Sequence, residues 1–296
     1  MPKPSPRNFI TGEEISGGRL VGLLDRAQEM AANRPAEGAG ALGGKSVALI
    51  FEKPSTRTRI SFEVGVAELG GTPVVLRGDE MQLSRGESPG DTARVLSRYV
   101  SAIAIRSGSH EEVVAMAEQA SVPVINALTP ELHPCQALAD LLTLKQRFGG
   151  LDGLKVAYVG DGTNVARSLA VTGALVGVEV VVAAPEGYQL EEGTPAVLTG
   201  DPHKAVHRAD AIYTDVWVSM GDEATAEQRR ADLERFRVDA DLLAAAKRET
   251  VVMHCLPAHP GEEITAEVLY GERSVVWDQA ENRLHAQKAL LEYLLG

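Results

Sequence analysis

The chain alternates short runs of apolar, β-branched residues with longer segments in which apolar residues recur every three or four positions. Runs that are apolar throughout predict strands buried on both faces, as in a parallel sheet covered by helices. The amphipathic segments Asp91–Tyr99 and Gln136–Arg147 predict two of these helices. This alternation predicts an α/β fold with right-handed crossovers. The predicted strands are Ser46–Phe51, Pro73–Leu76, Ala102–Ile105, Pro123–Asn126, Lys155–Val159, Val178–Ala183, Ala211–Val216, Thr250–His254 and Ser274–Trp277.

A glycine-rich stretch, Phe148–Gly153, follows a long predicted helix and marks the expected boundary between two domains. We expect a first domain over residues 1–148 and a second over residues 149–282, each a parallel sheet flanked by helices. The final helix, residues 283–296, is expected to pack back on the first domain. Because open α/β sheets bind ligands at the carboxyl ends of their strands, the active site is expected in the cleft between the two domains.

The composition restricts the classes of ligand. The chain has 29 basic and 41 acidic side chains, so its net charge of −12 repels nucleic-acid phosphates unless a local basic patch captures them. Aromatic residues make up only 4%, which leaves little material for base stacking. Two cysteines exclude a disulfide framework and favour a reducing compartment. We therefore expect a cytoplasmic protein without a signal peptide or membrane-spanning helix.

The segment Phe51–Arg59 combines a strand end, a helix start, three hydroxyl groups and two guanidinium groups. Ser55 or Thr56 can cap the helix, whose free backbone N–H groups then point at whatever ligand lies there. Arginine binds phosphate through two parallel hydrogen bonds, and hydroxyl groups add donors. The segment therefore predicts an anion site, and the alternative is a capped helix with solvated arginines.

Two further segments place polar side chains after predicted strands. His133 and Gln136 open a long helix and can bind a carbonyl oxygen and an amide. The alternative is structural, because Pro134 suits a first helical turn and His133 can cap the helix. Asp215 and Ser219 can hold an ammonium and a carboxylate group, unless the strand simply ends there in a turn.

The segment Met253–His259 leaves three interpretations open. Cys255 can be a nucleophile beside a base, or a buried and unreactive thiol. A zinc site is the third, although adjacent strand residues such as His254 and Cys255 are expected to point to opposite faces and so not to share one ion readily. The zinc ligands would come from His133, Cys135, His254, Cys255 and His259.

Two glycine-rich segments resemble nucleotide-binding motifs but depart from them. The segment Gly40–Ser46 ends as a P-loop does, yet Ala39 replaces the first glycine and the segment precedes a strand. The segment Gly160–Val165 follows a strand, but Val165 replaces the third glycine of a dinucleotide fingerprint. Nicotinamide binding by a dehydrogenase remains an alternative function.

Five segments together resemble the signatures of the aspartate/ornithine carbamoyltransferase family, in family order and from about residue 8 to the end of the chain. A single tetrapeptide carries little information, whereas five in order at compatible spacing are specific. The segments that contain Asp215 and His254 match the branch that acts on ornithine. The five segments are Ser55–Arg59, His133–Gln136, Asp215–Gly221, His254–Pro257 and Glu281–His285.

The resemblance implies transfer of the carbamoyl group from carbamoyl phosphate to the side-chain amine of ornithine, as in arginine biosynthesis, by direct attack without a covalent intermediate, metal or cofactor. The catalytic residues that it implies are Arg106, His133, Cys255 and Asp215. The carbamoyl phosphate residues are Ser55, Thr56, Arg57, Thr58, Gln82, Arg106, His133, Gln136, Cys255, Leu256 and Arg283. The ornithine residues are Asn164, Asp215, Ser219 and Met220.

The resemblance also implies a homotrimer, alone or as the basic unit of a multiple of trimers, in which Gln82 reaches the site of the neighbouring subunit. Two positions depart from the family, which often has asparagine where this chain has Thr163 and Arg167. Arg167 either adds a positive charge near the amino acid pocket or points away from it. The alternatives are a carbamoyltransferase for aspartate, putrescine or an acylated ornithine, and a non-catalytic subunit with the same fold.

Overall fold

A computed structural model describes residues 8–82, 86–219 and 221–296 of the chain. They form two compact units, of which the first contains the residues up to Leu142 together with Asn282–Gly296, and the second contains Thr143–Glu281. The helices α5 (Pro134–Phe148) and α11 (Val276–Leu295) contribute residues to both units. The limits expected at residues 148 and 282 stay predictions. Within the described residues, no helix has the length and apolar character needed to cross a membrane.

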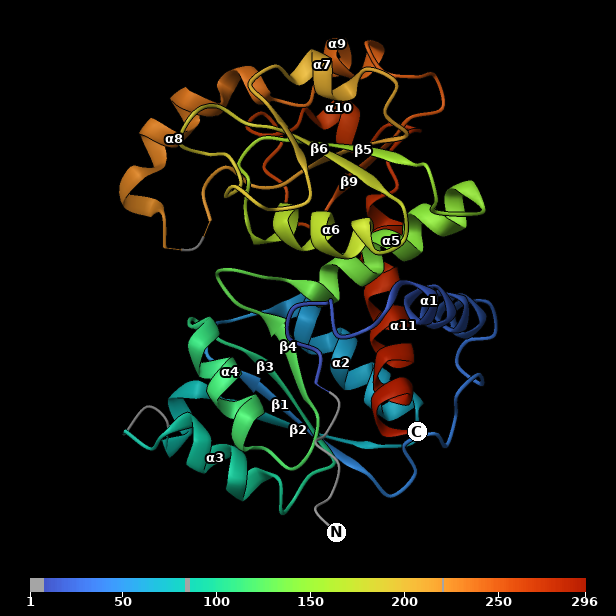
Figure 1. The fold of residues 1–296 in the computed structure, drawn as a ribbon, viewed down its shortest axis with the longest axis vertical. Coiled ribbons are helices and arrows are strands. Elements are labelled where there is room, and N and C mark those ends of the chain that lie inside the picture. The colour runs from blue at the N-terminus through green and yellow to red at the C-terminus, as the bar shows by residue number, and fades with distance from the viewer. Residues whose placement is uncertain (1–7, 83–85, 220) are drawn as a thin grey trace. The chain divides into compact units, whose positions relative to one another are not determined.

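The first unit contains a four-stranded parallel sheet with the strand order β2-β1-β3-β4 (Figure 1). The three strands other than β2 are almost entirely buried, whereas β2 lies at the edge and is only partly buried. The strands are β1 (Ser46–Phe51), β2 (Thr72–Arg77), β3 (Ala102–Arg106) and β4 (Val124–Leu128). The helices are α1 (Gly17–Ala32), α2 (Thr56–Glu68), the 3-10 helix η1 (Gly78–Glu80), α3 (Pro89–Leu96) and α4 (His110–Gln119).

Serine residues define where three helices of the first unit begin. The hydroxyl oxygens of Ser55, Ser88 and Ser109 each accept a hydrogen bond from a backbone N–H in the first turn of α2, α3 and α4. Each cap satisfies an otherwise unpaired donor and stabilises its helix by about 1 kcal/mol. The helix that follows β1 therefore starts at a defined residue.

The second unit contains a five-stranded parallel sheet with the order β7-β6-β5-β8-β9 (Figure 1). Its core joins apolar side chains of the strands to the helices, for example Val159, Ile212 and Val252 with Leu242 and Val268. The strands are β5 (Lys155–Val159), β6 (Glu179–Ala183), β7 (Val197–Thr199), β8 (Ala211–Thr214) and β9 (Val251–His254). The helices are α6 (Asn164–Ala174), α7 (Pro202–Val206), η3 (Glu223–Thr225), α8 (Ala226–Leu233), η4 (Glu234–Phe236), α9 (Ala240–Ala244) and α10 (Ala266–Leu269).

The predicted α/β fold with two parallel sheets is confirmed, but one predicted strand is wrong. Ser274–Trp277 is not a strand, because only Ser274 forms a bridge, to Val252, and α11 already begins at Val276. A run of β-branched residues there continues directly into a helix. The strand that was not predicted is β7, which lies at the edge of the second sheet next to β6. It has three mostly exposed residues, and its segment shows no alternation of apolar and polar residues.

The last turns of α11 are attached to the first unit by ion pairs. Lys288 is fully buried, and its Nζ donates to Glu68 Oε2 of α2 at 2.9 Å. Burial raises the pKa of Glu68, but its hydrogen bonds from Lys288 and Arg34 outweigh that effect, so the pKa lies below its ordinary value. Glu292 accepts from Nε of Arg26 of α1 at 2.7 Å. These contacts hold the residues at the end of the chain against α1 and α2.

Candidate active site

The predicted site residues follow strands on either side of the point where each strand order reverses. In the first unit Ser55 follows β1 and Arg106 ends β3, and these two strands are neighbours. In the second unit Asn164 follows β5 and Asp215 follows β8, which are also neighbours. The carboxyl ends at such a switch point are where open α/β sheets bind ligands. Each unit therefore gathers its own group of candidate residues.

The start of α2 forms one side of the group in the first unit. Ser55 Oγ accepts from the Thr58 N–H at 3.3 Å and from Arg106 Nη1 at 3.4 Å. Thr56 and Arg57, in the first turn, are exposed. Because the first N–H groups of a helix carry partial positive charge, this turn and the guanidinium of Arg106 together suit an anion.

Arg283 of α11 is buried between the start of α2 and α5. Its Nη1 donates to Gln136 Oε1 at 2.6 Å, and its Nη2 donates to Thr58 Oγ1 at 3.2 Å. Gln136 Nε2 in turn donates to Oδ1 of the fully buried Asp140 at 2.8 Å. These bonds fix the orientation of the Gln136 amide and make Thr58 Oγ1 an acceptor, so its own proton can point to a ligand. Asp140 was not selected from the sequence.

His133, just before α5, is buried with only 5% of its surface exposed. Burial holds the pKa of His133 well below its usual value of 6.5, and the charges of Arg283, Arg106 and Arg57 lower it further. The imidazole is therefore neutral at neutral pH and can donate one hydrogen bond without adding charge. Since all three guanidinium groups act on this ring, the structure brings together the predicted cations of the first unit.

Two other predicted residues of the first unit, Cys135 and Gln82, have surroundings that differ from those of this group of residues. Cys135 is buried, its Sγ donates to the Asn126 carbonyl at 3.3 Å, and burial raises the pKa of its thiol to about 12. The thiol therefore stays protonated and packs as a small apolar group. Gln82 is exposed, beyond η1 and next to residues 83–85, which lie outside the described part of the chain.

In the second unit, Asp215 and Cys255 are hydrogen-bonded. Cys255 Sγ donates to Asp215 Oδ1 at 2.8 Å, and the Val216 N–H donates to the same oxygen at 2.8 Å. Asp215 is buried, whereas Cys255 and Ser219 are only partly so. Asn164 is the first residue of α6 and is also partly buried. Met220 lies outside the described residues.

A buried pair sets the direction of the turn after β9. His254 Nδ1 accepts from the Leu256 N–H at 2.8 Å, so the ring proton is on Nε2, which donates to Glu263 Oε1 at 3.1 Å. Both side chains are almost completely buried. Leu256 has φ = +59°, an unusual conformation for a residue other than glycine, and the bond to His254 supports it.

The geometric argument made against zinc from the sequence is wrong at this turn. Because β9 ends at His254, the possible metal-ligating atoms of Asp215, His254 and Cys255 all lie within 4.8 Å of one another. Both ring nitrogens of His254 are nevertheless engaged in hydrogen bonds, and Cys255 is bonded to Asp215. The structure thus shows a hydrogen-bonded cluster whose histidine offers no free nitrogen to a metal.

Tyr158 lies next to this cluster and was missed in the sequence, where it stands within an otherwise mostly apolar strand. Its hydroxyl group lies 3.3 Å from Thr163 Oγ1, and its ring centre lies 5.2 Å from that of Tyr213. Burial raises the pKa of Tyr158 well above its ordinary value, and the charge of Asp215 raises it further. The phenol therefore stays protonated beside Asp215.

The segment with the incomplete dinucleotide fingerprint has another structural role. A Cβ at Gly162 would lie 2.8 Å from the Tyr188 carbonyl oxygen, and the Gly162 N–H donates to that oxygen at 2.8 Å. This glycine is therefore required by the close passage of the loop after β6. Arg167, the departure from the family pattern, forms a partly exposed ion pair with Glu191 at 3.2 Å.

Comparison with known proteins covers both halves of the chain. Residues 7–146 match the carbamoyl-P binding domain of aspartate/ornithine carbamoyltransferase, and residues 152–294 match its Asp/Orn binding domain. The ornithine carbamoyltransferase of Acidothermus cellulolyticus is 51% identical over 98% of this chain and 96% of its own length. The anabolic ornithine carbamoyltransferase of Pyrococcus furiosus is 54% identical over 86% of this chain and 85% of its own.

Solved structures agree with these matches. The ornithine carbamoyltransferase structure from Pyrococcus furiosus has a TM-score of 0.94 and 48% identity, covering 99% of this chain and 98% of that one. The structure from Thermus thermophilus has a TM-score of 0.92 and 45% identity, covering 98% and 99%. The motifs, the fold and these comparisons agree, and the chain belongs to the aspartate/ornithine carbamoyltransferase family.

Proposed function

We propose that this chain transfers the carbamoyl group of carbamoyl phosphate to the side-chain amine of ornithine, giving citrulline and inorganic phosphate. The observation that carries the proposal is that the guanidinium groups of Arg57, Arg106 and Arg283 act on a neutral, buried His133 just before α5. Ornithine as the acceptor is supported by the names of relatives about half identical over nearly the whole chain.

The residues of the first unit bind carbamoyl phosphate. The phosphate accepts hydrogen bonds from the first N–H groups of α2, from the hydroxyl groups of Ser55, Thr56 and Thr58, and from Arg57. Arg283 does not have to bind the phosphate directly, because it orients Thr58 and Gln136 through hydrogen bonds of 3.2 and 2.6 Å. In an acidic chain this local concentration of positive charge is what attracts the anion.

The carbonyl oxygen of carbamoyl phosphate gains negative charge as the amine attacks. Arg106 and the neutral imidazole of His133 donate hydrogen bonds to that oxygen, and Gln136 orients the carbamoyl amide. Donors that are already positioned stabilise the transition state, and the loss of one such donor typically lowers kcat by about 10²–10³-fold. The new C–N bond forms while the bond from carbon to the phosphate oxygen breaks. The phosphate leaves with the electron pair beside Arg57 and takes up the proton that the attacking nitrogen loses.

The residues of the second unit bind ornithine. The attacking amine has a solution pKa near that of lysine, about 10.4, and must lose its proton before it reacts. Asp215, with the Cys255 thiol donating to it at 2.8 Å, orients this amine. Asn164, Ser219 and Met220 hold the α-amino and α-carboxylate groups. Leu256, in the turn after β9, completes the pocket.

Assembly and location complete the proposal. The chain forms a homotrimer in the cytoplasm, and Gln82 of one subunit reaches the carbamoyl phosphate site of its neighbour. The exposure of Gln82 agrees with such a role. Light scattering is expected to give three times the chain mass of 31.5 kDa, or a multiple of that value, and a single-chain particle at assay concentration would contradict the trimer.

The direct test is a colorimetric assay for citrulline with carbamoyl phosphate and ornithine. We expect citrulline with ornithine and no carbamoylated product with aspartate, putrescine or N-acetylornithine, because Asp215 and Ser219 suit a diamine with a free α-amino group. Preferred carbamoylation of another amine would replace ornithine as the substrate, and no product with any amine would overturn the reaction itself.

Two substitutions test whether the two groups of residues serve different substrates. Arg57→Ala is expected to raise the KM for carbamoyl phosphate at least about tenfold, because a guanidinium–phosphate bond is lost. Arg59→Ala is the matched control, since Arg59 lies on the same helix but pairs with Glu63 on the surface. Asp215→Ala is expected to impair ornithine use more than carbamoyl phosphate binding. If Arg57→Ala or Asp215→Ala impaired the use of both substrates equally, the assignment of the two groups of residues to different substrates would be contradicted.

A further inference from the structure

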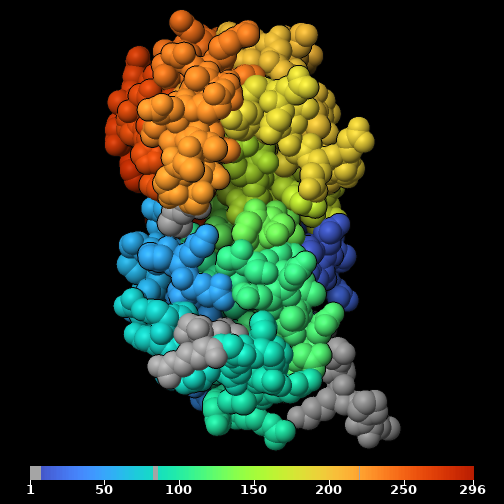
Figure 2. All heavy atoms as spheres, turned by 90° about the vertical axis from the view of Figure 1, so that its left-hand side faces the viewer, coloured from blue at the N-terminus to red at the C-terminus, as the bar shows by residue number. Residues whose placement is uncertain are grey.

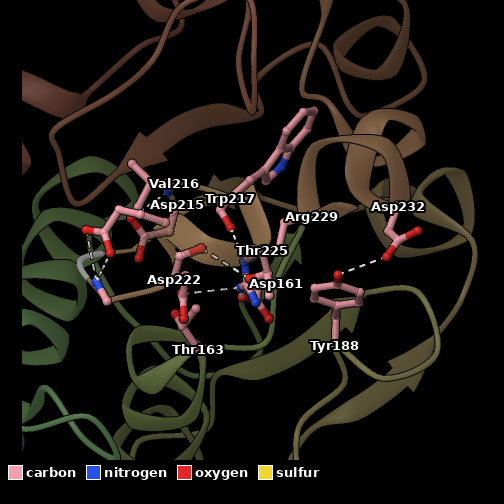
Figure 3. Close-up of polar contacts among 12 residues, drawn as sticks. Asp161, Thr163, Tyr188, Asp215, Val216, Trp217, Asp222, Thr225, Arg229 and Asp232 are labelled. Carbon is pink, nitrogen blue, oxygen red and sulfur yellow. Dashed lines mark hydrogen bonds and ion pairs between the residues drawn. The ribbon is translucent and has the colours of Figure 1, made fainter. Parts of the chain in front are cut away.

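Arg229 of α8 joins parts of the second unit that are far apart in the sequence (Figure 3). Its Nε donates to the Trp217 carbonyl oxygen at 2.6 Å, and its Nη2 forms an ion pair with Asp161, which follows β5. Its Cζ atom lies 5.2 Å from the centre of the Tyr188 ring. One guanidinium group therefore connects the chain after β5, the chain after β8 and the loop after β6.

The turn between β8 and η3 is held by Arg229 at both of its ends. Besides its bond to Trp217, Arg229 Nη2 lies 3.7 Å from Asp222 Oδ2. Between these contacts the Asp222 N–H donates to the Ser219 carbonyl oxygen at 3.0 Å, which closes the turn. Trp217 itself is buried, with 1% of its surface exposed. Ser219 thus lies on a segment whose ends depend on one arginine.

The ion pair is more shielded than an ordinary surface pair. The side chains of Arg229 and Asp161 are 16% and 14% exposed, whereas Arg230, the next residue of α8, is 46% exposed and pairs with Glu262. Charge-assisted hydrogen bonds in such surroundings are stronger than exposed pairs, which contribute little. Figure 2 shows that α8, coloured orange, and the yellow segment after β6 lie on one face of the second unit.

We propose that Arg229 is a positioning residue that, with Asp161 as its anionic partner, holds Trp217, Ser219 and Asp222 in the conformation in which Asp215 and Ser219 bind the amino acid substrate. This inference rests on the proposed function for the identity of that substrate. The contacts with Trp217 and Asp222 do not depend on it.

The charge of Asp161 makes this arrangement sensitive to pH. Burial raises the pKa of Asp161 to about 6, Arg229 opposes that effect, and Asp222 and Asp215 add to it. The other titratable groups that face Asp161 are the phenols of Tyr158 and Tyr188, and burial raises the pKa of both. As the pH rises through about 6, Asp161 becomes a carboxylate and the ion pair with Arg229 forms. The ion pair between Asp161 and Arg229 is therefore strongest at neutral and higher pH.

The first test is Asp161→Asn, which keeps the shape and removes the charge. At pH 8 we expect the KM for ornithine to rise about tenfold while the KM for carbamoyl phosphate changes by less than about twofold, since only the turn of the second unit loses a charged bond. The ratio of ornithine KM between variant and native protein is expected to fall toward one below pH 6, where native Asp161 is itself protonated. Because the titration of ornithine affects the KM of both proteins equally, it does not change this ratio.

Two further variants separate positioning from general stability. Arg229→Lys keeps a charge but cannot bond to both Trp217 and Asp161 as a planar guanidinium does, so its ornithine KM should lie between those of native protein and Asp161→Asn. Arg230→Gln removes a guanidinium from the same helix and is expected to leave both KM values unchanged. An unchanged ornithine KM in Asp161→Asn, or a ratio that does not vary with pH, would overturn the proposal.

Hydrogen–deuterium exchange gives a result that does not depend on the enzymatic reaction. Peptides covering residues 217–225 are expected to exchange faster in Asp161→Asn than in the native protein, while peptides of the first unit and of β5 stay unchanged. If native protein makes no citrulline, the proposed function fails, and exchange still decides whether the pair holds the turn. Unchanged exchange at 217–225, or faster exchange throughout the unit, would contradict the positioning role.

Discussion

The proposed carbamoyl phosphate site depends on a buried cation, Arg283. Arg283 donates to Thr58 and Gln136, and burying its charge is tolerated only because polar groups receive its N–H donors. Arg283 comes from the helix near the end of the chain, so the anion site requires that helix to be attached to the first unit. The contacts of Lys288 with Glu68 and of Glu292 with Arg26 provide that attachment. A substrate site formed near residue 55 is thus completed only when the last residues have folded.

The second unit uses the same principle with different residues. The strands β8 and β9 end just before Asp215 and Cys255. Polar pairs that are shielded from solvent then set the direction of the turns that follow these strands. His254 and Glu263 support the turn that carries Cys255, while Arg229 and Asp161 support the turn that carries Ser219. In both places the supporting residues are more buried or more strongly paired than the side chains proposed to touch the substrate. Buried, hydrogen-bonded residues hold the neighbouring hydrogen-bond donors in position before a reaction begins.

The sequence predicted the features that arise from local pattern. Apolar runs indicated most of the strands, and Ser55 was correctly placed at a helix start. It failed where local pattern is ambiguous, as at Ser274–Trp277, where β-branched residues continue into α11. It also could not reveal partners that meet only in the folded chain. The pairing of Arg229 with Asp161 spans 68 positions, and the direction of Cys255 depends on the turn after β9, where Leu256 donates to the buried His254.

We propose that the first unit presents a positively charged site around an uncharged imidazole. The most direct measurement is an NMR titration of His133, whose signals are identified by comparison with the variant His133→Asn. Because burial and the charges of Arg283, Arg106 and Arg57 lower its pKa, the titration midpoint of His133 is expected to lie well below the usual 6.5 in the free protein. A titration midpoint at or above the usual 6.5 would mean that the ring is solvated or distant from those guanidinium groups, and would contradict the account.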